Sequence, residues 1–360
     1  LNIVLIIAMV LAWAFGLQRS PNAGYMLAWG VAIAGALQLG VLAIAAQRAG
    51  MGLALVRPKL TPGVRRLFRL GIPGVLAGGI TQINILVGTM IASLEAGAMA
   101  YLYYADRIYQ LPLGMVGIAI GVVLLPDISR LLRAEDYDGV TESQNRSLEF
   151  SLLLTLPAAV ALFVIPEPII RVLFERGAFT AADSSATALG LAAFAWGLPS
   201  FVLIKVFSPA YFAREDTRTP MIYAGVGMIV NVIGSLILFF WLRSIGWPPH
   251  LGIAAASTIA GWVNAGLLWS TLRVRGHFEL DDQFLHSLPR ILLSSLIMGA
   301  GLWFGVRMIG DVFAPAPGFA IQIIALAGLV AFGFALFAVA IELTGAFRLR
   351  TLLKTLRRKA

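Results

Sequence analysis

Long apolar runs recur along the whole chain, and they limit its fold more than any other feature. We count ten runs of roughly 20 residues that carry almost no charge, the length that crosses a membrane as a helix. Lipid offers no partners to backbone groups, so only helices and closed barrels span it, and unbroken apolar runs favour helices. The predicted spans are 1–17, 25–46, 70–94, 98–126, 148–165, 186–213, 220–242, 250–272, 286–306 and 318–342.

The composition agrees with this prediction. Of the 360 residues 59% are hydrophobic and only 12% are charged, against about 25% charged residues in soluble domains. The absence of cysteine excludes disulfides, thiolate catalysis and cysteine-bound metals. The net charge of +9 would favour a nucleic-acid partner in a soluble protein, but here the positive-inside rule explains it. We therefore predict an all-α polytopic membrane protein with no nucleic-acid partner.

The basic residues are unevenly divided between the two sides of the membrane. With residue 1 inside, most of the 27 Lys and Arg residues fall in the inside connections, which places the C-terminus in the cytoplasm. These inside segments are 47–69, 127–147, 214–219, 273–290 and 343–360. Segment 1–17 has neither a basic leader nor a cleavage site, so we expect a chain that starts within a membrane helix rather than a signal peptide.

Three segments outside the spans are expected at the membrane surface. Segment 47–69 is basic, and Thr61 with Pro62 should open a short helix over 64–70 that acts as a linker or an anchor on the inner headgroups. Segment 166–177 is too short to span and indicates an interfacial helix. The basic tail 343–360 should bind anionic lipid.

The sequence Y-L-Y-Y-A-D-R at 101–107 puts two charges inside a predicted span. Burying either charge in a membrane costs about 2.5–3.5 kcal/mol, so such residues usually face a cavity or a bundle interior. Asp106 and Arg107 are neighbours and point about 100° apart, so they need not pair. Arg107 should share a face with Tyr103, Tyr104 and Gln110. We favour a cavity role for Arg107 over a structural ion pair.

Other polar residues lie in or beside predicted spans. Lys205 either faces a cavity or extends to the headgroups, and Arg214 opens the charged loop R-E-D-T-R-T. Gln82 and Asn84 lie in a span rich in Gly and Pro, of a kind that lines transporter binding sites or packs closely against a neighbour. Asn231 either makes a hydrogen bond between helices or lines the cavity.

Motifs of enzymes and ATPases are missing from the sequence. It contains no G-x-x-x-x-G-K-[ST], no H-E-x-x-H and no G-x-S-x-G. Its three histidines, His250, His277 and His286, are predicted at loops or helix ends, far apart in the sequence. The sequence therefore favours a protein that is not an enzyme.

Several short motifs occur together along the chain. Y-Y-A-D-R at 103–107 is preceded by G-I-P at 71–73 and followed by Q-L-P-L-G at 110–114. Further along are F-E-R-G-A-F-T at 174–180 and K-V-F-S-P-A-Y-F-A-R-E-D-T-R-T-P at 205–220. In combination they resemble the MurJ (MviN) family of lipid II flippases, within the multidrug/oligosaccharidyl-lipid/polysaccharide exporter (MOP) superfamily that also holds the MATE exporters. The resemblance extends over essentially the whole chain.

The resemblance implies a plan of fourteen helices in two six-helix lobes around a cavity, followed by a pair of helices that forms a lipid groove. Against that plan this chain resembles helices five to fourteen, a MOP/MATE-like bundle without most of its N-lobe. The implied parts are 1–46, the last two helices of the N-lobe; 47–69, a basic linker; 70–272, the C-lobe; 286–342, the groove pair; and 343–360, the tail.

The resemblance also implies roles for individual residues. Asp106 and Arg107 match the family's essential Asp-Arg pair, and Arg214 matches an important arginine after the tenth helix. Gln110 stands where some members have an acid. With Lys205, these residues are the candidate substrate-binding set. Gln82, Asn84, Tyr104 and Asn231 are weaker candidates that line the cavity.

Some members of the family bind sodium in the C-lobe, and Asn231 is the nearest candidate in this chain. No cofactor is expected. Coupling to a monovalent cation or to the membrane potential stays open.

The implied substrate is undecaprenyl-pyrophosphate-linked disaccharide pentapeptide, moved across the bacterial inner membrane by alternating access. Membrane lipids and the cell-wall synthesis machinery are the other expected partners. The alternatives are a polysaccharide or drug exporter of the same superfamily and a non-transporting membrane scaffold. Drug exporters should use acidic cavity residues for cationic substrates, whereas the candidates here are mainly basic.

Overall fold

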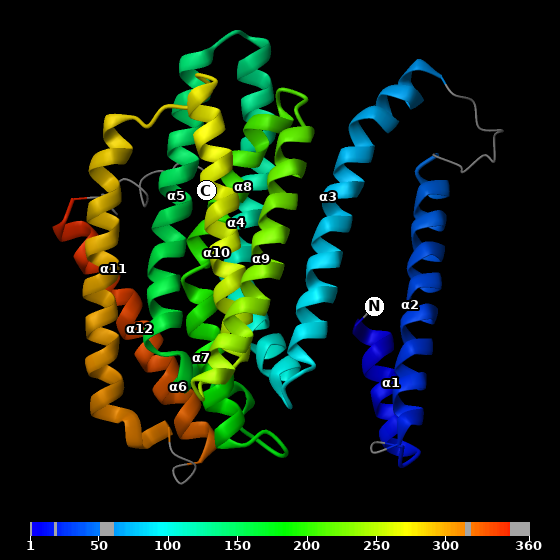
Figure 1. The fold of residues 1–360 in the computed structure, drawn as a ribbon, viewed down its shortest axis with the longest axis vertical. Helices are drawn as coiled ribbons and strands as arrows, with labels where there is room; N and C mark the ends of the chain where they lie inside the picture. The colour runs from blue at the N-terminus through cyan, green and yellow to red at the C-terminus, as the bar shows by residue number, and fades with distance from the viewer. Residues whose placement is uncertain (1, 18–19, 51–60, 314–317, 346–360) are drawn as a thin grey trace. The chain divides into compact units, whose positions relative to one another are not determined.

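A computed structural model describes residues 2–17, 20–50, 61–313 and 318–345 of the chain (Figure 1). Within these residues every regular secondary-structure element is a helix, so the predicted all-α class is confirmed. Seven helical stretches among the described residues are long and apolar enough to cross a membrane, with Ala181–Phe212 counted as one stretch. Helices α1 (Asn2–Ala14), α3 (Pro62–Ala92) and α4 (Ala98–Arg133), which also cover predicted spans, are not among these seven. The chain divides into two compact units, Leu1–Arg65 and Arg66–Ala360.

The first unit contains helices α1 (Asn2–Ala14) and α2 (Pro21–Arg48). Small residues let the two helices approach closely, since a methyl group added at Gly30 of α2 would lie 3.2 Å from Ala8 Cβ. The side chain of Ser20 caps α2 by accepting a hydrogen bond from the Asn22 amide at 3.2 Å. Both helices expose large apolar residues over most of their length, as membrane helices do.

Helix α3 (Pro62–Ala92) belongs to the second unit from Arg66 onward, and it joins α4 (Ala98–Arg133) through a tight turn at Gly97 with φ +82°. The separate surface helix predicted over 64–70 is wrong, because these residues form the first turns of α3. Residues 51–60 of the predicted linker 47–69 and residues 346–360 of the predicted tail lie outside the described residues.

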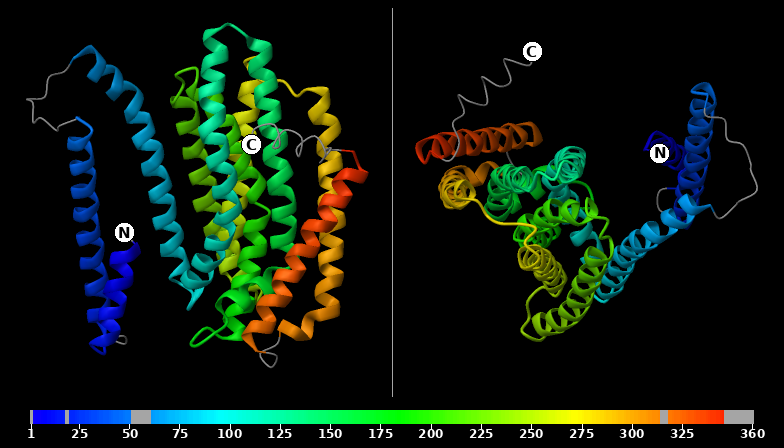
Figure 2. Two further views of the ribbon diagram at one scale, coloured as in Figure 1. Left: turned by 180° about the vertical axis from the view of Figure 1, so that it is seen from behind. Right: turned by 90° about the horizontal axis from the view of Figure 1, so that it is seen from above.

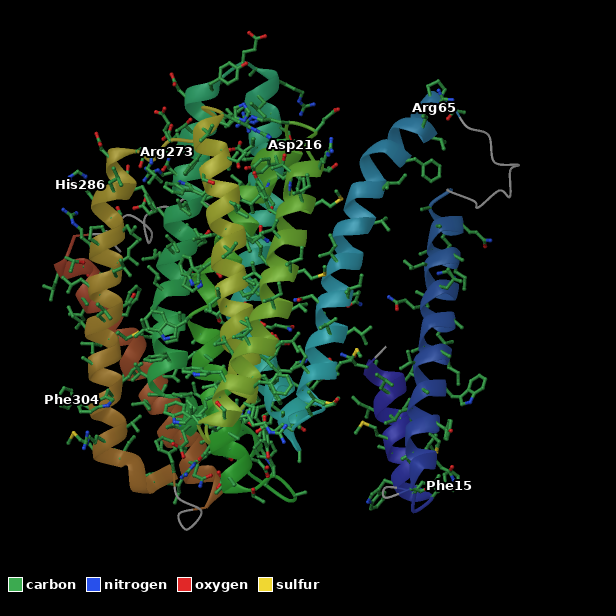
Figure 3. All side chains as sticks on the ribbon, in the orientation of Figure 1. Phe15, Arg65, Asp216, Arg273, His286 and Phe304 are labelled. Carbon is green, nitrogen blue, oxygen red and sulfur yellow. The ribbon has the colours of Figure 1, made fainter. Side chains whose placement is uncertain are left out.

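The remaining helices of the second unit follow in order. They are α5 (Tyr137–Val164), α6 (Pro166–Phe174), α7 (Ala181–Ala195), α8 (Leu198–Phe212), α9 (Arg218–Ser244), α10 (His250–Val274), α11 (Asp282–Ile309), the 3₁₀ helix η1 (Gly310–Phe313) and α12 (Phe319–Leu343). Helix α6 confirms the short helix predicted over 166–177. Figure 3 places Asp216, Arg273 and His286 at one end of this unit and Phe304 at the other.

Two apolar clusters form the core of the second unit. One joins α4 to α5, α6, α7, α11 and α12, and contains Ile108, Ile165 and Leu191. The other joins α4 to α5, α8, α10 and the start of α11, and contains Leu124, Val202 and Leu268. Helix α4 contributes to both clusters, so one of its faces is fixed over most of its length.

The span predicted as one helix over 186–213 is instead broken at Trp196–Gly197 into α7 and α8. Because α7 ends at Ala195, carbonyl groups of its last turn and of the break lack donors within the helix. Helix α10 supplies replacement donors: the Thr258 hydroxyl donates to the Ala193 carbonyl at 2.9 Å, and the Trp262 indole donates to the Trp196 carbonyl at 3.0 Å. The break is therefore held by side chains from a helix distant in the sequence.

Helices α11 and α12 lie side by side at one edge of the second unit (Figure 2). Small residues bring them close: a methyl group added at Gly305 of α11 would lie 2.9 Å from Leu329 of α12. Polar residues fix the start of α11 on α5, where Asn145 donates to the Glu279 carbonyl at 2.8 Å and Arg146 pairs with Asp281 and Glu149. The predicted lipid groove of this helix pair stays a prediction.

Candidate functional site

Helix α4 has one buried face and one exposed face. Its buried face packs Ala105, Ile108, Tyr109 and Val116 into the core. At helical spacing on the other side, an exposed stripe carries Tyr103, Arg107, Gln110, Leu111 and Gly114. Arg107 therefore lies on a face that other helices of the second unit leave uncovered.

Arg107 is held by its own helix. Its guanidinium carbon lies 4.6 Å from the centre of the Tyr103 ring, one turn earlier, which is a cation–π contact. Arg107 pairs with no carboxylate among the described residues, so the structural ion pair considered from the sequence is not found there. Its hydrogen-bond donors remain directed toward the exposed face, where they could bind an anion.

Asp106 is half-buried and accepts a hydrogen bond from the Gln110 side chain. It is not paired with Arg107, as the 100° separation predicts. Gln110 thus has a defined place in the stripe: it orients Asp106 one turn away. Asp106, Arg107 and Gln110 are brought together by one helix.

Tyr104 does not belong to the exposed stripe, so the expectation that it shares a face with Arg107 is wrong, and its role as a residue that lines a cavity stays a prediction. Its ring packs against Phe174 and Phe179, with ring centres 4.7 and 5.4 Å away. Aromatic contacts at these distances are favourable. Tyr104 therefore packs the connection between α6 and α7 onto α4.

Lys205 of α8 lies across helix α4, at Gly117. A methyl group added to Gly117 would be 2.7 Å from Lys205 Cδ and 3.3 Å from Nζ. The missing side chain of Gly117 gives the Lys205 stem its path, while Lys205 itself stays exposed. Gly117 is ten residues after Arg107, so the two cations belong to levels of α4 roughly 15 Å apart, at about 1.5 Å per residue.

Arg214 lies just after the end of α8, in the loop before α9. It is half-buried, and its Nη1 donates to the Ala210 carbonyl at 2.8 Å. Burial lowers the pKa of its guanidinium from the ordinary value. His277, in the loop after α10, belongs to the same end: burial first, and then the charges of Arg214 and Arg275, lower the pKa of its imidazole. The spacing in the sequence gave no sign that His277 neighbours Arg214.

Asp216 balances part of this positive charge. It accepts hydrogen bonds from the Thr219 amide at 3.0 Å and from Arg275 at 2.8 Å. Burial opposes ionisation of Asp216, but the bonds from Thr219 and Arg275 outweigh it and lower the pKa of its carboxyl group. Arg275 is thereby neutralised, whereas Arg214 has no carboxylate partner among the described residues.

Asn84 and Asn231 meet between α3 and α9. The Asn231 amide donates to the Asn84 oxygen at 2.8 Å, and the Asn231 oxygen accepts from Ser235 and Ser257, each at 3.2 Å. The predicted interhelical hydrogen bond of Asn231 is confirmed. Gln82 is exposed and, two residues from Asn84, lies on another face of α3.

A sodium site near Asn231 stays a prediction. The Asn84 and Asn231 oxygens accept hydrogen bonds from their neighbours, and these four residues include no carboxylate. Over the described residues no group of three or more His, Asp or Glu side chains could hold a metal. The arrangement suits a neutral hydrogen-bonded link between α3, α9 and α10.

A buried link that the sequence did not reveal ties the α3–α4 turn to α10. His250 is only 1% exposed; its amide donates to Glu95 at 2.9 Å, and its Nε2 lies 3.0 Å from the Ala186 carbonyl of α7. Tyr101 packs against the His250 ring and donates to Asp183 at 2.8 Å. This link fixes the first turns of α4, and with them the position of the exposed stripe.

The chemistry available on α4 and α8 is that of anion binding. An exposed Arg presents a planar fork of donors that matches phosphate oxygens, and a Lys adds a mobile point charge. Arg107, Lys205 and Arg214 lack carboxylate partners among the described residues, so their charges are available to a ligand.

Comparisons with known proteins agree with this arrangement. Residues 1–323 match the family model "Lipid II flippase MurJ". The chain is 47% identical over 347 residues to the probable lipid II flippase MurJ of Rhizobium meliloti (strain 1021), which covers 96% of this chain and 64% of that protein. It spans 55% of the Rhizobium tropici relative, at 47% identity over 299 residues. The chain thus spans between about half and two thirds of these curated relatives.

Solved structures give the same result. A lipid II flippase MurJ in an inward closed conformation superposes with a TM-score of 0.65 at 26% identity, over 94% of this chain and 64% of that one. A MATE transporter in complex with MaL6 superposes with a TM-score of 0.50 at 17% identity, over 76% of this chain and 62% of that one, which shows a shared fold alone. From the family match and these similarities, the chain belongs to the MurJ family of lipid II flippases.

Proposed function

We propose that the protein moves lipid II, the undecaprenyl-pyrophosphate-linked peptidoglycan precursor, from the inner to the outer leaflet of the bacterial cytoplasmic membrane. The observation that carries this proposal is Arg107, on the uncovered face of a helix in a chain of the MurJ family. A pyrophosphate suits the guanidinium fork of Arg107, because two donors can meet two phosphate oxygens.

Arg107, Lys205 and Arg214, which lack carboxylate partners among the described residues, divide the work by position. Arg214, at the end of α8 that we assign to the cytoplasm, receives the pyrophosphate first. Lys205 and Arg107 then hold it at successive levels of α4. The lipid tail stays in the bilayer beside α11 and α12 while the polar headgroup crosses by alternating access.

Asp106 and Gln110 have a supporting role. A carboxylate close to a phosphate site weakens anion binding, so it must be held in a fixed place. The Gln110 side chain holds Asp106, and the Asp106 charge keeps the pyrophosphate on the Arg107 side of the helix. No step of this mechanism breaks a covalent bond, which fits a transporter rather than an enzyme.

The charges of the loops favour a C-terminus in the cytoplasm. In this proposal membrane lipids surround the helices, and the cell-wall synthesis machinery uses the flipped precursor. The gene should restore growth of a bacterium depleted of its own lipid II flippase. Lysis in spite of normal protein levels in the membrane would contradict the proposal.

A further inference from the structure

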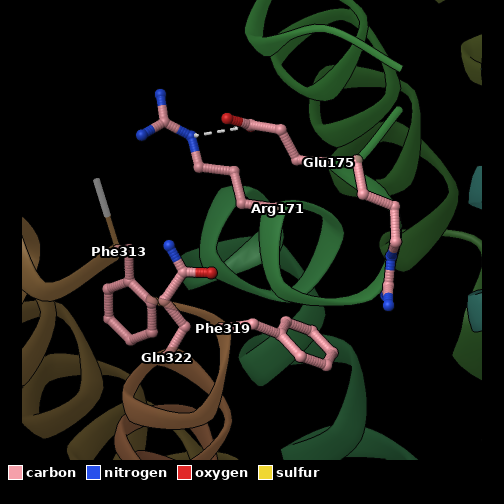
Figure 4. Close-up of a pocket in the computed structure, with 6 residues that line it drawn as sticks. Arg171, Glu175, Phe313, Phe319 and Gln322 are labelled. Carbon is pink, nitrogen blue, oxygen red and sulfur yellow. Dashed lines mark ion pairs between the residues drawn. The ribbon is translucent and has the colours of Figure 1, made fainter. Parts of the chain in front are cut away.

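A polar pocket lies where α6 meets the start of α12, apart from the exposed stripe of α4 (Figure 4). It encloses about 370 Å³, within the range of roughly 300–1,000 Å³ typical of small-ligand sites. Its lining residues are Arg171, Glu175, Arg176, Phe313, Phe319 and Gln322. Three elements, α6, η1 and α12, thus build one pocket from segments more than 100 residues apart.

We expect the pocket to lie at the level of lipid headgroups. Helix α6 begins directly after α5 ends at Val164, and η1 follows directly after α11 ends at Ile309. The ends of membrane helices lie at the boundary between hydrocarbon and water. Helix α6 is amphipathic, with Ile169 and Ile170 buried and Arg171 turned toward the pocket, as expected of a helix lying in this boundary.

The charges of the pocket are of both signs. Arg171 donates to Glu167 at 2.7 Å, while its Nε lies 3.6 Å from Glu175 Oε2, too far for a hydrogen bond. Both of these atoms are buried and lack a hydrogen-bond partner among the described residues. Buried polar atoms normally have hydrogen-bond partners. Arg171 Nε can therefore still donate to a ligand, and Glu175 Oε2 can still accept from one.

Aromatic rings and a second cation complete the lining. The Arg176 guanidinium carbon lies 4.6 Å from the centre of the Phe319 ring, and Arg176 donates to the Val172 carbonyl at 3.2 Å. These contacts fix Arg176 between the end of α6 and the start of α12. Phe319 and Phe313 add apolar surface below the charged groups, as the glycerol end of a lipid requires.

We propose that this pocket binds the headgroup of a zwitterionic phospholipid that carries a phosphate and a primary ammonium. Arg171 and Arg176 donate to the phosphate, and Glu175 accepts from the ammonium. A purely anionic headgroup would satisfy the arginines but would leave Glu175 facing a second negative group. The bound lipid would join α6 to α12 and so fix the last helix on the bundle, apart from any flipped substrate.

Native mass spectrometry of the intact protein in detergent tests the proposal, with phosphatidylethanolamine and phosphatidylglycerol offered separately. We expect the wild type to bind one phosphatidylethanolamine molecule with an affinity about tenfold higher than for phosphatidylglycerol. A difference of this size corresponds to one charge-assisted hydrogen bond. Glu175→Gln should abolish this preference while phosphatidylglycerol still binds. Arg171→Gln should weaken both lipids about tenfold. Arg243→Gln, which removes an exposed charge at the end of α9, is the matched control and should change neither.

The Glu175→Gln result cannot arise from unfolding, because phosphatidylglycerol binding by the same variant reports an intact pocket. Thermal unfolding of each variant checks the Arg171→Gln protein separately. Equal binding of the two lipids by the wild type, or a preference that survives Glu175→Gln, would overturn the proposal. So would an equal loss of binding in Arg243→Gln.

Discussion

At the scale of single residues, the cations of this protein differ mainly in whether a carboxylate neutralises them. Arg146 and Arg275 are paired with acids and hold elements together. Arg107 instead lies over an aromatic ring, which orients its guanidinium without neutralising it. That difference separates a binding group from a structural one, and the sequence motif alone did not show it.

Gly117 leaves room for the side chain of Lys205, so a methyl group at position 117 should displace that side chain. We expect Gly117→Ala to lower flipping about as much as Lys205→Ala does, and the double variant to lose no more. Protein stability should be unchanged or raised by up to about 1 kcal/mol, because Ala favours a helix more than Gly does. Cellular flipping and thermal unfolding are the measurements.

Gly114→Ala provides the control for this prediction, since nothing lies within 4 Å of the added methyl group at this position of the same helix. It should leave flipping unchanged. Full activity of Gly117→Ala beside a damaged Lys205→Ala would show that the path over Gly117 is irrelevant to the role of Lys205.

At the scale of helices, the break between α7 and α8 depends on donors from α10. Thr258→Val removes the hydroxyl that donates to the Ala193 carbonyl while it keeps the side-chain shape. We expect a loss of about 1–3 kcal/mol in the free energy of unfolding, the cost of one buried carbonyl left without its partner. Denaturant unfolding in detergent measures it.

Ser270→Ala on the same helix is the matched control, because the Ser270 hydroxyl donates only within α10, at an exposed position. It should cost less than about 0.5 kcal/mol, as exposed substitutions usually do. Equal effects of the two variants would mean that the freed carbonyls at the break are satisfied in another way.

The connections after α8 and α10 should make stability depend on pH through His277. Burial and the charges of Arg214 and Arg275 lower the folded pKa of His277 below its unfolded value of 6.5, so the unfolded chain binds the proton more readily. The contribution of His277 is therefore complete above about pH 6.5 and is lost as the pH falls toward the lower folded pKa.

Thermal unfolding between about pH 7.5 and about pH 5, a range that includes the ordinary His pKa of about 6.5, measures this dependence. The variant His277→Gln should remove most of the loss on acidification. His286→Gln, at an exposed position of α11, should retain it. A wild-type protein whose stability is flat across this range would contradict the predicted direction.

At the scale of the whole molecule, much of the fold could be predicted from hydropathy. All ten predicted spans lie on helices within the described residues, although two helices share the span 186–213. The short helix α6 lies in segment 166–177, where a short helix was predicted. The break at Gly197 could not be foreseen, because Thr258 and Trp262 stabilise it from more than 60 residues away. The surface helix over 64–70 failed because no residue there stops helix α3.

The candidate site was predicted in part. A charge inside an apolar run marked Asp106 and Arg107, and the structure unites them with Gln110. Tyr104 was misplaced because 100° of rotation separates neighbours on a helix, and Phe174 and Phe179 fill the space on its side. His277 and the pocket around Arg171 arise from tertiary contacts, which no local pattern records.

The orientation of the molecule can be tested because the chain has no cysteine of its own. Single cysteines at Ala178, in the exposed connection between α6 and α7, and at Asp138, in the first turn of α5, should lie on opposite sides of the membrane. A maleimide that cannot cross membranes should label position 178 in intact cells and position 138 only after lysis. The reverse pattern would invert the proposed direction of transport.

The most direct test of the central claim is the amount of lipid II that an external probe can reach in cells that depend on this protein. Wild-type protein should maintain it, and Arg107→Ala should abolish it at normal protein levels, since Arg107 is exposed and its loss leaves the fold intact. Arg107→Lys should retain part of it, because a lysine keeps the charge without the planar fork. Normal external lipid II with Arg107→Ala would contradict the account.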